Sequence, residues 1–308
     1  MCYVLGMSIR LTSVLSVAAT LAVAASLVGA CSSSTADGTT TTDGGSDASP
    51  TSEDASKDAA QDIDAAPGDQ IGAVFAISDS ETSDGGTTGR HRAGGFFART
   101  ISPDTTTITK TVGPCVLEKV GDGEQAEEEA ASAGALHIEG GNKAIDITPK
   151  GDKSYAAVTG TEPLWAGGET LTARADGSDV PAFSTSLKAP SKISLTAPAT
   201  NGGDLTITRS TGVTATWTGA SSGVVVLYFD VATSANAFTA TCTFDVAAGT
   251  ATIPAGAFAD FPAGEGTFDF YVKESVVVTP PGWYVRFTAS SAIVDGKGSA
   301  LAGRATFQ

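Results

Sequence analysis

The pattern closest to a catalytic motif is GASSG at residues 219–223, which matches the G-x-S-x-G motif of serine hydrolases. In those enzymes the serine lies on a sharp turn between a strand and a helix, so that its hydroxyl is exposed to a histidine. Here the alternating segment Val213–Thr218 precedes the motif, and an apolar, strand-like run follows it. The pattern therefore predicts a Gly/Ser-rich hairpin loop around Ser221, and not a nucleophile.

Only two histidines are available as general bases. His137 lies in the alternating segment ALHIE, which is typical of a strand, whereas His91 lies in a predicted loop between Arg90 and Arg92, whose charges lower a histidine pKa. The sequence contains no HExxH, phosphate-loop or dinucleotide motif, and no CxxC or Cys/His cluster of the kind that binds zinc. We therefore expect a protein that is not an enzyme and that carries neither a cofactor nor a metal.

Glycoside hydrolysis is the alternative activity, because it needs only two carboxyl groups at a set separation. The candidates are Asp230, Asp245, Asp269 and Glu274, which lie on or near predicted strands of the C-terminal half. The simpler interpretation places these side chains on solvated strand faces and at loop ends.

Three aromatic residues favour carbohydrate binding if they are exposed, because a flat ring with a polar edge suits a partly wet surface. Trp165 precedes a Gly-Gly pair, and Trp283 and Tyr284 follow a Pro-Pro-Gly turn. The competing interpretation is that all three pack in the core, which is the usual place of large aromatic side chains. Trp217 alternates with threonines and is expected in the core.

The cysteines Cys115 and Cys242 leave two outcomes open. If the chain is exported to an oxidising compartment, they can form a disulfide, which requires Cα atoms within about 7 Å of each other. Their positions in different predicted domains favour two separate buried thiols instead. The alternation of residues 237–246 places Cys242 on the apolar face of a strand.

The segment LTSVLSVAATLAVAASLVGAC at residues 11–31 indicates where the chain is delivered. Arg10 precedes an uncharged apolar run, and small residues lead to Cys31, an order typical of a bacterial export signal. The segment resembles the lipobox of bacterial lipoproteins, which implies removal of residues 1–30 and lipidation of Cys31. The alternatives are an ordinary signal peptide and an uncleaved transmembrane anchor, since residues 11–30 are long enough to span a bilayer. We expect attachment to a membrane through the lipid on Cys31, in the cell envelope, at the outer membrane or the cell surface.

Residues 31–70 are predicted to be a disordered acidic linker. From residue 32 onward they contain nine acidic residues and one lysine, which gives −8 of the net charge of −16. Such a composition buries too little apolar surface to fold. The chain also lacks a cluster of Lys and Arg, which excludes nucleic acid as the expected partner.

The remaining chain is predicted to be all-β, with two sandwich-like domains at residues 71–190 and 191–308. Short apolar or alternating runs recur roughly every ten residues between turn-forming residues, which favours a sandwich over βαβ units. Residues 223–232 are apolar on both faces and suit a central strand. The acidic run at 124–133 is expected to be an exposed loop with about one turn of helix.

Two resemblances accompany this pattern. The segment VTATWTGASSGVVVLYFDV at residues 213–231 resembles an early strand pair of fibronectin-III or immunoglobulin-like domains, with Trp217 as the core tryptophan. The combination of lipobox, Asp/Ser/Thr-rich linker and β-rich body resembles myxobacterial-type lipoproteins. The residues that carry this second resemblance are Gly113-Pro114-Cys115, LWAGGE at 164–169, VPAF at 180–183 and Ile253-Pro254. Both resemblances imply architecture and location, and no activity.

The sequence therefore predicts a lipid-anchored cell-envelope protein with a non-catalytic binding, adhesion or structural role toward a protein or polysaccharide partner. The alternative is a carbohydrate-binding or glycan-hydrolysing surface protein. Exposure of Trp165 or Trp283 would favour glycan binding, and two carboxylates facing each other across a cleft would favour hydrolysis.

Overall fold

The computed structural model describes residues 70–83, 86–102, 107–121, 127–200, 204–219, 222–296 and 301–308, without the side chains of residues 79–90 and 101–102. Cys31, the predicted signal peptide and residues 31–69 of the predicted linker lie outside the described residues. The described elements are strands and the 3₁₀ turns η2 (Val246–Ala248) and η3 (Ala255–Phe258), so the predicted all-β, sandwich-type fold is confirmed. The described residues include no helix that could span a membrane.

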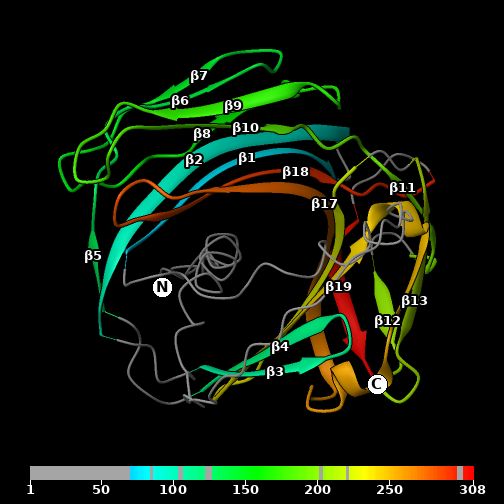
Figure 1. Cartoon of the computed structure of the whole chain (residues 1–308). Coiled ribbons are helices and arrows are strands. Elements are labelled where there is room, and N and C mark those ends of the chain that lie inside the picture. The colour runs from blue at the N-terminus through cyan, green and yellow to red at the C-terminus, as the bar shows by residue number, and fades with distance from the viewer. Residues whose placement is uncertain are drawn as a thin grey trace, which may run out of the picture. The chain divides into compact units, whose positions relative to one another are not determined.

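The largest sheet has twelve strands (Figure 1). Nine of them follow the order β3-β4-β15-β14-β17-β18-β1-β2-β5. Strand β19 pairs with β17 and with β12, and β8 pairs with β2. The members are β1 (Gln70–Ser83), β2 (Gly86–Ser102), β3 (Thr107–Val112), β4 (Cys115–Val120), β5 (Glu127–Ala130), β8 (Val158–Gly160), β12 (Leu205–Ile207), β14 (Val224–Ala232), β15 (Ala237–Asp245), β17 (Gly264–Val278), β18 (Tyr284–Ala292) and β19 (Ala302–Phe307).

Two smaller sheets accompany the large one. A four-stranded sheet has the order β10-β9-β6-β7, and a three-stranded sheet has the order β11-β13-β16. Figure 1 shows the four-stranded sheet stacked over β1, β2 and β18. Their strands are β6 (Leu136–Glu139), β7 (Ile145–Ile147), β9 (Thr170–Ala175), β10 (Phe183–Lys188), β11 (Ser194–Ala197), β13 (Val213–Thr218) and β16 (Thr250–Ile253).

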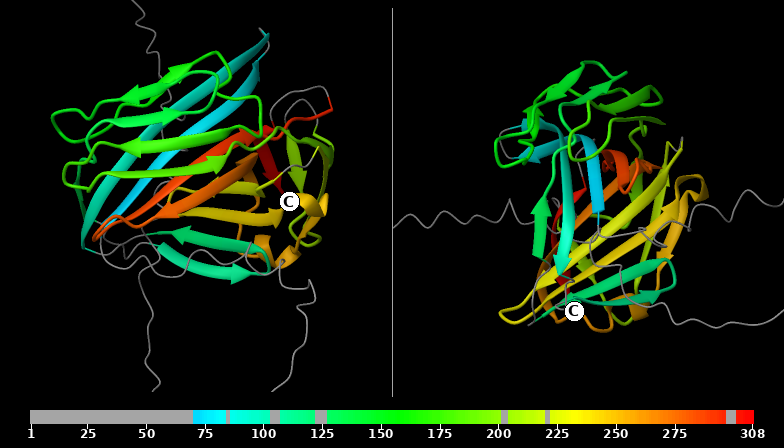
Figure 2. Two further views of the ribbon diagram at one scale, coloured as in Figure 1. Left: turned by 45° about the horizontal axis from the view of Figure 1, so that its top comes forward. Right: turned by 60° about the vertical axis from the view of Figure 1, so that its left-hand side comes forward.

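The large sheet takes strands from both sides of the expected domain boundary at residues 190 and 191. Strand β4 pairs with β15, and β1 lies parallel to β18, so early and late strands are neighbours in Figure 2. The described residues from 70 to 308 accordingly belong to one compact unit. Pairing with late strands also removes the exposed edges that the early hairpins would otherwise present.

Each small sheet covers its own hydrophobic core on the large sheet. The first core contains Trp217 of the three-stranded sheet and Phe229 of β14, and the second contains Leu136 of the four-stranded sheet and Phe287 of β18. Gly95 of β2 allows the close approach of the four-stranded sheet, because a Cβ atom there would lie 2.4 Å from Cδ1 of Leu136.

Both cores lie on the same face of the large sheet. Along β17, Phe268, Phe270 and Val272 belong to the first core, and Val276 and Val278 pack against the second. These residues are all an even number of positions apart in a regularly paired strand, so their side chains point to one face. Neither small sheet therefore covers the opposite face, which we call the second face.

Of the predictions for two individual segments, one is confirmed and one is wrong. Strand β14 is central, between β15 and β17, as the apolar run at 223–232 predicted. The acidic run at 124–133 was wrongly expected to be a loop with a helical turn, because Glu127–Ala130 forms strand β5 at the sheet edge. An edge strand with both faces exposed needs no apolar alternation, so composition alone did not reveal it.

Candidate functional site on the second face

The second face carries most of the tyrosines and several charged side chains. It is formed by the residues that alternate with the core positions on β14, β15, β17 and β18. Three of the five tyrosines of the chain lie here, and all three are partly exposed. The polar and aromatic residues contributed by β14, β17 and β18 are Tyr228, Asp230, Thr267, Asp269, Tyr271, Lys273, Ser275, Tyr284, Arg286, Thr288 and Ser290.

The sequence of β17 shows why these residues face away from the cores. Phe268, Phe270 and Val272 are almost fully buried, whereas Asp269 is exposed and Tyr271 is partly exposed. Burying the apolar set against one core turns every polar neighbour to the opposite face, because strand side chains alternate.

One end of the second face is acidic. Tyr228 lies directly opposite Asp269 on β17 and two residues before Asp230 on its own strand. Burial raises the pKa of Tyr228, and the negative charges of Asp230, Glu118 and Asp269 raise this pKa further. Thr267 donates a hydrogen bond to the carboxylate of Asp230. This end therefore offers acceptor groups around an aromatic ring.

The other end of the second face is basic. Lys273 lies opposite Ser290. Burial, and to a smaller extent the nearby charge of Arg286, lowers the pKa of Lys273 from 10.5 to about 8. Arg286 donates a hydrogen bond from Nη2 to the Tyr284 hydroxyl at 3.3 Å. Its guanidinium also lies 5.9 Å from the centre of the Tyr284 ring.

Tyr271 lies between the two ends. It is two residues from Asp269 on one side and two from Lys273 on the other, so the acidic and basic groups are separated by roughly 13 Å along β17. Burial raises the pKa of Tyr271, as do the charges of Asp269 and Tyr228. The phenol therefore remains protonated at neutral pH and can donate a hydrogen bond.

The expectation that Trp165 and Trp283 could line a ligand surface is wrong. Trp165 is only 3% exposed, and its Nε1 donates to the carbonyl of Pro190 and to Oγ of Ser291, both at 3.1 Å. Trp283 is 4% exposed and belongs to the second core. Both indoles fill the interface between the small and large sheets, whereas Tyr284 alternates away from that interface onto the second face.

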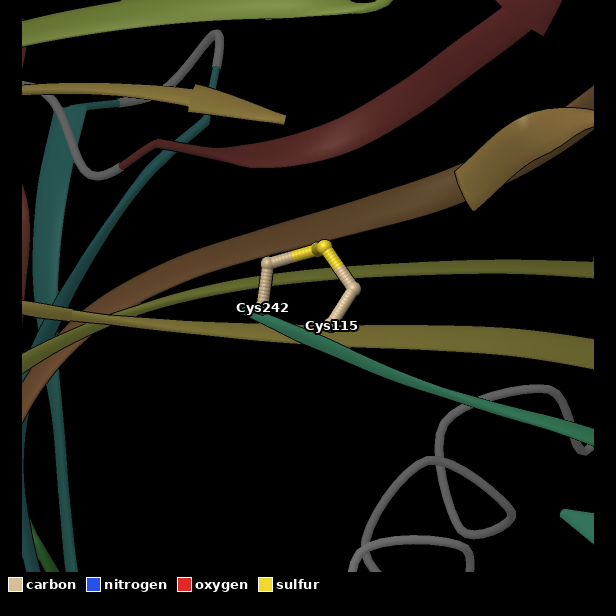
Figure 3. The surroundings of a disulfide bond; sticks show 2 residues. All are labelled: Cys115 and Cys242. Carbon is tan, nitrogen blue, oxygen red and sulfur yellow. A yellow bond between two sulfur atoms is a disulfide. The ribbon is translucent and has the colours of Figure 1, made fainter. Parts of the chain in front are cut away.

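Cys115 and Cys242 form a disulfide (Figure 3). They are direct partners in the antiparallel pair β4–β15, with Cα atoms 4.0 Å apart. The expectation of two separate thiols is wrong because it assigned the cysteines to separate domains, whereas their strands are neighbours in one sheet. Both residues lie in the first core, as the alternation predicted for Cys242.

The four candidate carboxylates do not form one site. Asp230 and Asp269 are diagonal neighbours on the second face, at roughly 7–8 Å between Cα atoms. Asp245 instead accepts a hydrogen bond from the backbone of Ala247 and caps η2. Glu274 alternates to the opposite face of β17. Asp230 and Asp269 therefore lie side by side on one sheet rather than facing each other across a cleft.

The GASSG motif joins β13 of the three-stranded sheet to β14 of the large sheet. The expected hairpin is therefore wrong, since the two strands belong to different sheets. Ser221 lies outside the described residues. The motif is followed by strand β14, whereas the hydrolase turn requires a helix at this position.

A serine and a histidine do meet inside the fold. Ser78 of β1 and His91 of β2 are direct partners, with Oγ 3.2 Å from Nδ1. His91 therefore lies in a strand rather than in a loop, and burial is the main cause of its lowered pKa, followed by the charge of Lys192. Exposures of 1% and 2% keep this pair away from any substrate in solvent.

His137 lies on the outside of the four-stranded sheet between two carboxylates. Its Nδ1 is 2.6 Å from Asp146, and its Nε2 is 3.2 Å from Asp176, which also pairs with Arg174. These hydrogen bonds, led by that of Asp146, raise the pKa of His137 above 6.5. The imidazolium form therefore stabilises the contact between β6, β7 and the end of β9.

We expect this contact to make a small pH-dependent contribution to stability. Because the pKa is raised on folding, the contribution is complete below pH 6.5 and is lost as the pH rises through the folded-state value. We expect His137→Gln to cost no more than about 1 kcal/mol at pH 5.5 and nothing at pH 9. Urea unfolding across this range, with proton NMR titration of the two histidines, measures both quantities. A folded-state pKa of His137 below that of His91 would contradict the assignment.

Within the described residues, no group of three or more His, Cys, Asp or Glu side chains could hold a metal ion. The residues of the second face were missed by motif searches because none of them belongs to a motif. The detectable signal was the alternation of β17, where aromatic and charged residues share one face.

Comparison of the chain with protein-family models, with curated protein sequences and with solved structures finds no match.

Proposed function

We propose that this chain is a lipid-anchored protein of the cell envelope that binds a glycan on its second face without catalysis. The observation that supports the proposal is the placement of both small sheets on one face of the large sheet. The opposite face then presents Tyr228, Tyr271 and Tyr284 among hydroxyl and carboxylate groups.

These groups match the chemistry of a sugar surface. Tyrosine rings offer apolar area to the C–H face of a sugar, and their hydroxyls remain available for hydrogen bonds. Carboxylates such as Asp269 are acceptor-only groups that suit sugar hydroxyls, while threonine and serine hydroxyls both donate and accept. A surface that is mostly apolar would instead favour a protein partner of the adhesion or scaffold kind, which is the second candidate.

The location is part of the same proposal. Lipidation of Cys31 would attach the chain to the membrane, and residues 32–70 would connect the lipid to the β-rich unit. A coil of this length has a root-mean-square reach of roughly 35 Å, enough to place the binding face away from the membrane surface. The proposed partners are therefore the membrane, through the lipid, and an envelope polysaccharide.

Truncating a central tyrosine tests the binding face. We expect Tyr271→Ala in the full-length, detergent-solubilised protein to weaken binding to polysaccharide from the native cell surface about tenfold, because the ring supplies the stacking area. Tyr271→Phe should retain most of the affinity. The matched control is Ile108→Ala, which removes a 66% exposed side chain from β3. Calorimetric titration gives the affinities. Equal affinity of Tyr271→Ala and the native protein, or retention of no polysaccharide, would overturn the proposal.

A further inference from the structure

Lys273 is a cation that has no counter-charge within the described part of the chain. Among the described residues, its ammonium makes no ion pair and no hydrogen bond. The guanidinium of Arg286, which is also positive, acts on this ammonium and lowers its pKa further than burial alone does. Asp269 is four residues away along the strand, roughly 13 Å at the backbone.

This arrangement is unfavourable for the lysine among the described residues. Burial penalises an ammonium that lacks a partner, and a neighbouring like charge adds to the penalty. The lowered pKa of Lys273 reports both effects. An anion bound to Lys273 on the side of Arg286 would remove the penalty on the ammonium, and a titratable group held in such an unfavourable state is characteristic of a functional site.

The neighbouring side chains suit an oxyanion. Lys273 is opposite Ser290, and the next pair along the two strands is Ser275 with Thr288, whose hydroxyls are 2.9 Å apart. Arg286 lies two residues beyond Thr288 on the same face. An ammonium, a planar guanidinium and several hydroxyls together match the oxygens of a carboxylate or a phosphate.

The acidic end of the face limits what else the ligand can carry. Asp230, Asp269 and Glu118 surround Tyr228, so a dense polyanion would be repelled there. Neutral sugar hydroxyls, in contrast, can donate hydrogen bonds to these carboxylates. Charge complementarity therefore favours a ligand with one anionic group followed by neutral rings.

We infer that Lys273, Arg286 and the hydroxyls between them bind the anionic group of an acidic glycan, whose neutral rings extend over Tyr271 toward Tyr228. This inference rests on the proposed glycan-binding function and specifies its ligand class. The anionic group is a sugar carboxylate or a sugar phosphate, since both present the same oxygens to these residues.

Paired ligands that differ only in charge test the inference. The probes are a short oligogalacturonate and its methyl ester, with glucose 6-phosphate and glucose as the phosphate pair. For the full-length protein in detergent, calorimetry should show at least tenfold tighter binding of one charged ligand than of its neutral partner. A preference for oligogalacturonate over its methyl ester indicates a carboxylate ligand, and a preference for glucose 6-phosphate over glucose indicates a phosphate ligand.

Two variants connect the preference to the site. Lys273→Met and, separately, Arg286→Gln should each lower affinity for the charged ligand to within about threefold of the neutral one. Lys150→Gln, which removes an exposed lysine from a turn outside the second face, should retain the full preference. Thermal unfolding checks that each variant is folded.

The outcomes separate this inference from the proposed function. Equal binding of charged and neutral forms, weakened in both by Tyr271→Ala, would overturn the anionic site and leave glycan binding standing. A preference that persists in both Lys273→Met and Arg286→Gln would also overturn the anionic site. Binding of no member of the panel and of no native polysaccharide would overturn both.

Discussion

Replacing Cys115 and Cys242 together by alanine is expected to lower the free energy of unfolding by about 3–5 kcal/mol. The bridge joins residues 127 positions apart and therefore restricts a long loop of the unfolded chain. It also connects β4 to β15, so its loss weakens the attachment of the β3–β4 hairpin to the sheet. Urea unfolding monitored by tryptophan fluorescence measures the change.

Reduction of the native protein provides the control for this experiment. A thiol reductant should shift the unfolding midpoint of the native protein toward that of the double variant and leave the double variant unchanged. If the reductant and the double substitution both leave the midpoint of unfolding where it is in the oxidised native protein, the bridge contributes nothing to stability.

Trp165→Ala is expected to destabilise the chain by about 3–5 kcal/mol. The substitution empties a buried site between the four-stranded sheet and the large sheet, and it leaves the carbonyl of Pro190 with one donor fewer. Trp165→Phe should cost about 1–3 kcal/mol, because it keeps most of the volume and removes the indole N–H. Thermal and urea unfolding of the three proteins measure both costs.

Tyr284→Ala is the matched comparison on the second face. It removes a partly exposed aromatic residue and should change the free energy of unfolding by less than about 1 kcal/mol. A Trp165→Ala protein of native stability with weakened glycan binding would show instead that the indole contacts ligand.

The sequence was sufficient to predict those strands that a short run of residues identifies by itself. The alternation around Trp217 predicted a half-buried strand, and the apolar run of β14 predicted a central strand. In each case the pattern of apolar and polar residues along the strand itself shows which of its faces are buried. The same local pattern could not show which strands are neighbours. The pairing of Cys115 with Cys242 depends on the register of β4 against β15, which no short segment specifies.

The candidate site was only partly predictable for a related reason. The composition of β17 shows that Asp269, Tyr271 and Lys273 share a face, but it does not show that both small sheets pack on the other one. Trp165 and Trp283 lie next to turns, where the alternation of a strand does not indicate to which side a side chain points. Their burial depends on the long-range packing of the sheets and could not be predicted locally.

The parallel pairing of β1 with β18 also affects how the fold is reached. Ile71, at the beginning of the β-rich unit, pairs with Tyr284, close to its end. The β1–β2 hairpin can form early, but its free edge has no partner until nearly the whole chain has been synthesised. A fold of such high contact order closes its loops at a large entropic cost and therefore assembles slowly. In a cell, this delay keeps the chain open for longer, which makes it compatible with transport as an unfolded polypeptide and dependent on protection from aggregation until β17 and β18 arrive.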